Sequence, residues 1–196
     1  MTMKDNSSSI LVSDSIVDEL ASVDALIFDC DGVLVDITQS YDTAINKTVS
    51  YILDDILQIQ AENIVTPDIL YGFKSKGGFN DEVAVCYAVV LTSYAARKLD
   101  KQFDEVVKDV IANSNESGIL SVDEYLTSLD IEVSDIKEKL NYSNPHETSY
   151  IYTVFDQIFY GAQLYEEIYD IPSKLLEAGL IEKDSCLLYT SPSPRD

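Results

Sequence analysis

Two carboxylates one residue apart, Asp29 and Asp31, are the side chains of this sequence best placed to do chemistry. They follow the apolar run Ala25-Leu26-Ile27-Phe28 and are followed at once by Gly32. Because side chains alternate along an extended chain, both carboxylates are expected to project to the same side. Two such charges repel each other unless a cation lies between them or one keeps its proton. The pair therefore indicates either a cation site or a carboxyl group that holds a proton.

The element expected to position this pair is a strand over residues 25–28. The apolar run is too short for a helix and too continuous for a half-solvated strand, which favours a strand buried on both faces of a parallel sheet. Gly32 allows the backbone to turn sharply just past it. Open sheets bind ligands outside the carboxyl ends of their strands, so the aspartates stand where a nucleophile would be placed.

Residues 37–177 are expected to be almost entirely helical. Apolar residues recur every three or four positions from Ile37 to about Leu57, the pattern of an amphipathic helix. Thr66-Pro67 predicts the start of a second helix, which ends at Gly77-Gly78. Further helices are expected over about 80–99 and 101–112, from a capping box at 121–124, and along a tyrosine-rich stretch at 150–169 that breaks near Gly161.

Composition narrows the class of protein. The 196 residues carry 13 basic and 35 acidic side chains, a formal charge of -22, which argues against nucleic-acid or anionic-membrane partners. Cys30, Cys86 and Cys186 lie far apart and match no disulfide or metal spacing, which suits a reducing cytoplasm. The polar start MTMKDNSSS leads into no signal-peptide segment, and no run reaches membrane-spanning length. A soluble cytoplasmic protein is expected.

Two other interpretations of the aspartate pair remain open at this point. A calcium loop of the EF-hand type fits poorly, because that loop has glycine sixth and follows a helix, whereas here glycine is fourth and a strand leads in. A polar turn without chemistry is also open, since Asp and Gly are ordinary turn residues. Two acids on one side of a strand end, with apolar residues on both flanks, are however not typical of turns.

The stretch LIFDCDGVLVD at 26–36 resembles the first motif of the haloacid dehalogenase (HAD) superfamily, whose phosphatase members carry DxDG at the end of the first core strand. A strand followed at once by a helical insert resembles the first-position cap of that superfamily. More narrowly, DITQSYDTAINKTV at 36–49 and KSKGGFND at 74–81 resemble a mostly archaeal group of these hydrolases. The chain departs from that group after Asn80, where a tryptophan is expected nearby and this chain has none.

The resemblance implies a phosphomonoesterase acting on a small phosphorylated metabolite. Asp29 would attack phosphorus and form an aspartyl phosphate, and Asp31 would act as general acid and then general base. Mg²⁺ would be held by Asp29 and by Asp31 through its backbone carbonyl. The second acid argues for phosphate chemistry rather than dehalogenation, and a phosphomutase with the same motif remains open.

Residues of the helical segment are weaker candidates. Lys74, in a glycine-rich turn, and Asn80 could contact a substrate from the cap, and a solvated surface position is the alternative for both. His146, the only histidine, is expected to be an ordinary surface residue. The tyrosines at 150–169 are expected to belong to the cap's apolar core.

The expected fold class is α/β. It consists of a HAD-like Rossmannoid core, represented mostly by its first strand, with an inserted all-α cap, so that the chain as given is mostly α. The expected segments are a core part at 1–36, the cap at 37–177, a return toward the core at 178–185, and a non-native tail at 186–196. That tail, CLLYTSPSPRD, resembles read-through of a sequencing adapter.

The later motifs of the superfamily are missing from the sequence after the cap. These are a Ser or Thr that ends a second core strand, a lysine that neutralises phosphate, and an acidic pair that completes the metal site. We therefore expect that the natural chain continues beyond this sequence and that the fragment is inactive. A non-catalytic, acidic helical interaction module is the alternative function.

Overall fold

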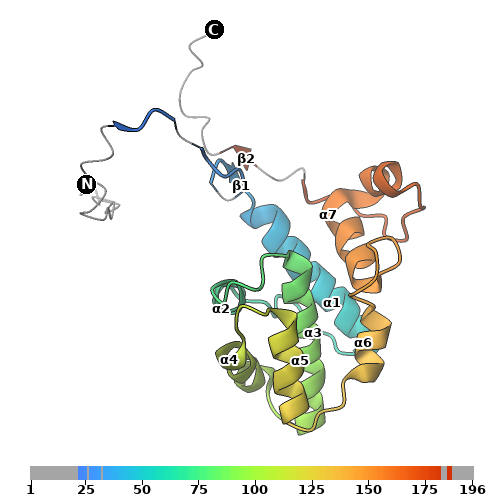
Figure 1. The fold of residues 1–196 in the computed structure, drawn as a ribbon. Coiled ribbons are helices and arrows are strands. Elements are labelled where there is room, and N and C mark those ends of the chain that lie inside the picture. The colour runs from blue at the N-terminus through green and yellow to red at the C-terminus, as the bar shows by residue number, and fades with distance from the viewer. Residues whose placement is uncertain (1–21, 26, 32, 182–184, 187–196) are drawn as a thin grey trace, which may run out of the picture.

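The structure, a computed structural model, describes residues 22–25, 27–31, 33–181 and 185–186. Two short strands, β1 (Val35–Asp36) and β2 (Ser185–Cys186), pair antiparallel. In Figure 1 this strand pair lies beside the start of α1, and the helices gather into one body below it. The helical elements are the π-helix η3 (Thr38–Asp42), α1 (Thr43–Leu57), α2 (Pro67–Lys74), α3 (Glu82–Leu99), α4 (Phe103–Asn113), α5 (Ile119–Ser128), α6 (Ser134–Leu140) and α7 (Tyr150–Tyr169).

Helix α3 is the centre of the body. Every residue from Val83 to Ala96 is buried, because α1, α4, α5 and α7 all pack against it. A helix surrounded in this way is apolar on all sides rather than on one stripe. The long apolar stretch around Cys86 is therefore explained by its central position, and the predicted helix over 80–99 is confirmed.

Local signals set most of the helix ends. The Thr66 hydroxyl accepts a hydrogen bond from the Ile69 N–H at 3.3 Å, with Pro67 in the first turn, as predicted for α2. The capping box predicted at 121–124 is wrong, because α5 already begins at Ile119. The Ser121 hydroxyl instead donates to the Gly118 carbonyl at 2.6 Å, inside the helix.

A glycine breaks α7, as predicted. Gly161 has φ 77° and ψ 167°, a conformation that residues with a Cβ rarely adopt. A Cβ at this position would lie 2.3 Å from the Gly179 nitrogen. The kink thus lets the chain returning from α7 pass directly against it.

The predicted strand at 25–28 is wrong for the described residues of that run. Ala25, Ile27 and Phe28 are not in a strand, and the side chains of Ile27 and Phe28 are 99% and 61% exposed. A strand needs a neighbour to pair with its backbone groups. Within the described residues the sheet consists of β1 and β2, and Val35 of β1 forms one further isolated bridge, with Asp31 rather than with the run at 25–28. The expectation of a mostly helical chain is confirmed, and a Rossmannoid sheet is not seen in the described part.

Some predictions fall outside the described residues. One is a helix over 10–23, which the helix-like spacing of Ile16, Val17 and Leu20 predicts and of which the structure describes only the last two residues. Another is the tail expected at 186–196, of which only the first residue is described. Within the part that the structure describes, no helix combines the length and the apolar character needed to cross a bilayer.

Candidate functional site

The aspartate motif lies at the surface. Asp29 and Asp31 are both exposed, and the Asp29 carboxylate accepts a hydrogen bond from the Cys30 N–H at 2.8 Å. The Cys30 carbonyl accepts hydrogen bonds from the N–H groups of Leu34 and Val35, at 2.8 and 2.9 Å. The chain thus turns back on itself just after the motif, and both carboxylates are accessible from solvent.

The motif suits a hard cation in the kind of donor it offers. Carboxylate and carbonyl oxygens are the ligands that Mg²⁺ prefers in proteins. Among the described residues, however, no three His, Cys, Asp or Glu side chains converge on one point. An ion held by Asp29 and Asp31 would therefore keep most of its coordination shell as water, which Mg²⁺ tolerates.

A charged cluster surrounds Lys74 at the end of α2. The Lys74 ammonium pairs with Glu82 at 2.9 Å, and the two side chains are 36% and 20% exposed. Asp42, at the end of η3, lies close enough to interact electrostatically with both Lys74 and Glu82. Burial raises the pKa of Asp42, Lys74 opposes this, and Glu82 and Asp36 add to it. The Lys74 ammonium therefore interacts with two carboxyl groups, those of Glu82 and Asp42.

Asn80 lies near this cluster in sequence and is exposed. The turn before it is held by backbone contact, since a Cβ on Gly118 (φ 62°) would lie 2.2 Å from the Gly78 carbonyl oxygen. In the described part of the chain, no hydrogen bond or ion pair joins Lys74 or Asn80 to either motif aspartate. The structure therefore gathers Lys74, Asp42 and Glu82, and leaves the motif as a separate exposed turn.

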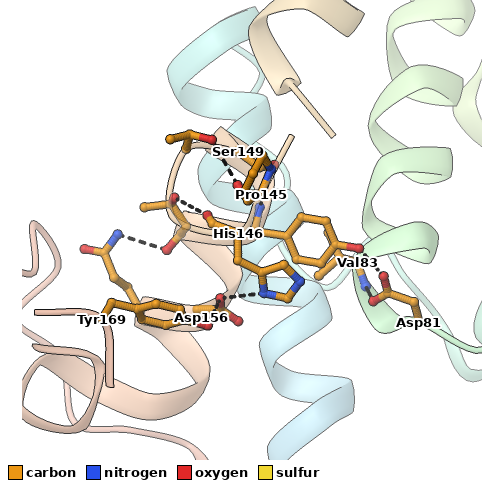
Figure 2. A network of polar contacts seen from close by, with 11 residues as sticks. Asp81, Val83, Pro145, His146, Ser149, Asp156 and Tyr169 are labelled. Atoms are coloured by element: carbon orange, nitrogen blue, oxygen red, sulfur yellow. Dashed lines mark hydrogen bonds and ion pairs between the residues drawn. The ribbon is translucent and has the colours of Figure 1, made fainter. Parts of the chain in front are cut away.

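A second polar network, which the sequence did not predict, links α3, α7 and the connection at 141–149 (Figure 2). Asp81 caps α3 by accepting a hydrogen bond from the Val83 N–H at 2.9 Å. The same carboxylate accepts hydrogen bonds from the hydroxyls of Tyr142, at 3.3 Å, and Tyr152. One side chain thus ties together three segments that are distant in sequence.

The network continues to a buried carboxylate on α7. Asp156 is 8% exposed and accepts a hydrogen bond from the Tyr169 hydroxyl at 2.8 Å, and its carboxylate lies 3.3 Å from His146 Nδ1 (Figure 2). Burial raises the pKa of Asp156, and the Tyr169 hydroxyl and His146 oppose the rise. The sequence feature that could have indicated Asp156 is its position as an acid between the apolar residues Phe155 and Ile158.

His146 is exposed, as predicted, but it is not an isolated surface residue. Its ring stacks on Tyr152, with centroids 3.9 Å apart, and its side chain is 51% exposed. The prediction that the α7 tyrosines join the core is confirmed for Tyr165, which is buried. Tyr150 packs against the core and its hydroxyl donates to Asp55, whereas the Tyr169 ring contacts Tyr165 and its hydroxyl donates to Asp156.

The surface hollows do not coincide with the predicted site residues. One hollow of about 430 Å³ lies between α1 and the segment at 175–177, and another of about 580 Å³ lies at the α7 kink. Neither is lined by a motif aspartate, by Lys74 or by Asn80. The geometry of these hollows thus gives no support for a substrate pocket at those residues.

Comparison with known proteins identifies a solved structure whose fold is similar to that of this chain. No protein-family model matches the chain, and no curated protein does either. Among solved structures, the chain is similar to phosphatase Tt82 from Thermococcus thioreducens, with a TM-score of 0.52 and 21% identity. The similarity covers 81% of this chain and 52% of that phosphatase, so the chain spans about half of its length. The chain therefore has the fold of part of a solved phosphatase.

Proposed function

We propose that this chain carries the aspartate motif and the helical cap of a Mg²⁺-dependent HAD-superfamily phosphomonoesterase. The observation that carries the proposal is the similarity of most of the chain to part of a phosphatase. The motif LIFDCDGVLVD at 26–36, which resembles that of HAD phosphatases, leads directly into the helical body and supports the assignment. The proposed substrate is a small phosphorylated metabolite.

Asp29 is the proposed nucleophile. Its exposed carboxylate attacks phosphorus in line, the bond to the leaving alcohol breaks, and an aspartyl phosphate remains on Asp29. Asp31 donates a proton to the leaving oxygen and then takes one from the water that hydrolyses the aspartyl phosphate. Mg²⁺, held by Asp29 and the Asp31 carbonyl, would offset the crowded negative charge.

Lys74 is proposed to contact the part of the substrate away from phosphorus. Its ammonium is paired with Glu82, so a substrate group would have to share or replace that partner. Asn80 is exposed at the start of α3 and is the second proposed contact. Both proposals require the cap end to lie over the motif in the complete enzyme.

The described residues supply a nucleophile and a proton carrier but few groups that position phosphate. Phosphoryl transfer depends mostly on positioning and electrostatic stabilisation. We therefore propose that turnover needs core residues beyond those described. Residues 1–196 alone should keep a helical circular-dichroism spectrum and show no turnover of p-nitrophenyl phosphate with Mg²⁺.

The test of the proposed function uses a longer chain. The natural reading frame is extended past Cys186 from its genomic source, and p-nitrophenyl phosphate hydrolysis is measured with Mg²⁺. Asp29→Asn should abolish turnover, Asp31→Asn should reduce it strongly, and Asp54→Asn, on an exposed part of α1, should leave it unchanged. Near-normal activity of Asp29→Asn would refute the assignment.

An acidic helical interaction module is the second candidate. The helical body buries a continuous core of its own, and the formal charge of -22 gives it a strongly acidic character. A stop codon directly after Cys186 in the genomic sequence would favour this function. A continuing frame with a strand ending in Ser or Thr would favour the phosphatase.

A further inference from the structure

The connection between α6 and α7, residues 141–149, contacts α7 through His146, whose Nδ1 lies 3.3 Å from the Asp156 carboxylate. We propose that this contact, between His146 and Asp156, is a pH-dependent clamp. Protonated His146 closes the connection onto α7, and loss of that proton as the pH rises releases it. This inference concerns the helical body itself and does not depend on the proposed phosphatase activity.

The geometry places an accessible base against a buried acid. His146 Nδ1 lies 3.3 Å from the Asp156 carboxylate, which is 8% exposed and has the Tyr169 hydroxyl as its other partner at 2.8 Å. Half of the His146 side chain is exposed, so protons exchange freely with solvent. A charge-assisted hydrogen bond is roughly twice as strong as a neutral one. The protonated form therefore holds Asp156 more tightly.

The groups around the pair come from three segments. Tyr160, Tyr165 and Tyr169 of α7 and Asp81 before α3 face Asp156. Glu147 on the connection acts on Tyr165 and Tyr169, and the Tyr152 ring lies under His146. Burial raises the pKa of each of these four tyrosines above its ordinary value, so they stay neutral.

Between pH 5 and 8, histidine is the side chain whose charge ordinarily changes. The raised pKa of Asp156 sets the acidic limit of the clamp, because a protonated Asp156 no longer attracts the imidazolium. The clamp is therefore strongest where His146 is charged and Asp156 is still ionised. It weakens on both sides of that range.

Backbone amides in the connection at 141–149 can report whether it is held against α7. The N–H groups of Thr148 and Ser149 both donate to the Pro145 carbonyl at 2.9 Å, and the Thr153 hydroxyl donates to the His146 carbonyl at 3.1 Å. These hydrogen bonds form the turn that carries His146 (Figure 2). Release of the imidazole leaves this turn with fewer anchors, so its amides should exchange faster.

The test is hydrogen exchange of the Thr148 and Ser149 amides in residues 1–196, followed by NMR from pH 5.5 to 8.5. Protection factors, corrected for the intrinsic pH dependence of exchange, should fall about tenfold across this range. The Ala95 amide, in the buried middle of α3, serves as the control for global stability and should not change.

Two variants keep the test decisive. His146→Gln can still donate to Asp156 but does not titrate, so protection at Thr148 and Ser149 should become independent of pH. Asp156→Asn removes the charge of the acceptor and should give low protection throughout. Equal protection of the wild type at all pH values, or an unchanged pH dependence in His146→Gln, would overturn the clamp. Because no turnover is measured, either outcome leaves the phosphatase proposal untouched.

Discussion

The Tyr152 hydroxyl on α7 donates a hydrogen bond to Asp81, which lies 71 positions earlier and caps α3. The N-cap of the central helix α3 is thus supported by a side chain of α7, at the far end of the helical body. Tyr142 donates to the same carboxylate, so Asp81 is shared by three segments. This joint makes the start of α3, with Asn80 and Glu82 on either side of Asp81, dependent on how α7 packs.

Asp81→Ala should destabilise the fold by about 2 kcal/mol. The change removes the cap of α3 and leaves two half-buried tyrosine hydroxyls without their acceptor. The free energy of unfolding is measured by urea denaturation with circular dichroism. Asp54→Ala, at an exposed site of α1, is the control and should change it by less than about 0.5 kcal/mol. A similar loss in both variants would show that the Asp81 joint has no special role.

Stability should fall steeply above pH 10. Burial and a neighbouring carboxylate raise the pKa values of Tyr87, Tyr150, Tyr152 and Tyr169 above the ordinary value of 10.0. A group with a raised pKa in the folded state contributes stability below its unfolded pKa and loses it as the pH rises toward the folded value. Urea denaturation from pH 8 to 11 measures this loss.

A single variant separates this tyrosine effect from general alkaline repulsion. Tyr150→Phe removes one hydroxyl, which donates to Asp55, and keeps the ring. The variant should therefore lose stability less steeply between pH 10 and 11 than the wild type. Identical slopes would mean that Tyr150 does not contribute to the alkaline limit.

Gly161→Ala should destabilise the fold by at least about 2 kcal/mol. The substitution adds a methyl group at φ 77°, 2.3 Å from the Gly179 nitrogen, so the returning chain must move. Gly77→Ala is a matched control, because Gly77 also has a positive φ, 82°, but a Cβ there meets nothing within 4 Å. Its cost should be limited to backbone strain, about 1 kcal/mol. Equal losses in thermal denaturation would exclude the close contact as the cause.

On the proposed phosphatase function, Lys74→Ala in the extended chain should raise KM for the proposed metabolite phosphoester more than for p-nitrophenyl phosphate. Lys74 is proposed to contact the part of the substrate away from phosphorus, which the small analogue lacks. Steady-state kinetics on both substrates measures the difference, and Lys76→Ala, two residues further along the same turn, is the control. Equal effects on both substrates would return Lys74 to the role of a partner for Glu82.

Much of the helical body could be predicted because its signals are local. Apolar periodicity, the Thr66-Pro67 start of α2 and the break at Gly161 all depend on a few consecutive residues. The start of α5 was misplaced because the Ser121 hydroxyl can bond either as a cap or inside a helix. The turn at 114–118 favours the bond inside the helix, because the Asn115 N–H donates to the Ser121 hydroxyl and that hydroxyl donates to the Gly118 carbonyl.

The sequence by itself determined most of the helical segments in the described part of the chain, although it did not predict α6, and it determined where the paired aspartates lie. Helices could be predicted because they satisfy their backbone hydrogen bonds within a few residues. Only the tertiary structure decided the rest. The run at 25–28 is apolar enough for a strand but has no strand partner in the described part of the chain. The contacts of Asp81 with Tyr152, and of Asp156 with His146, join groups that only the packing of α7 brings within hydrogen-bond distance.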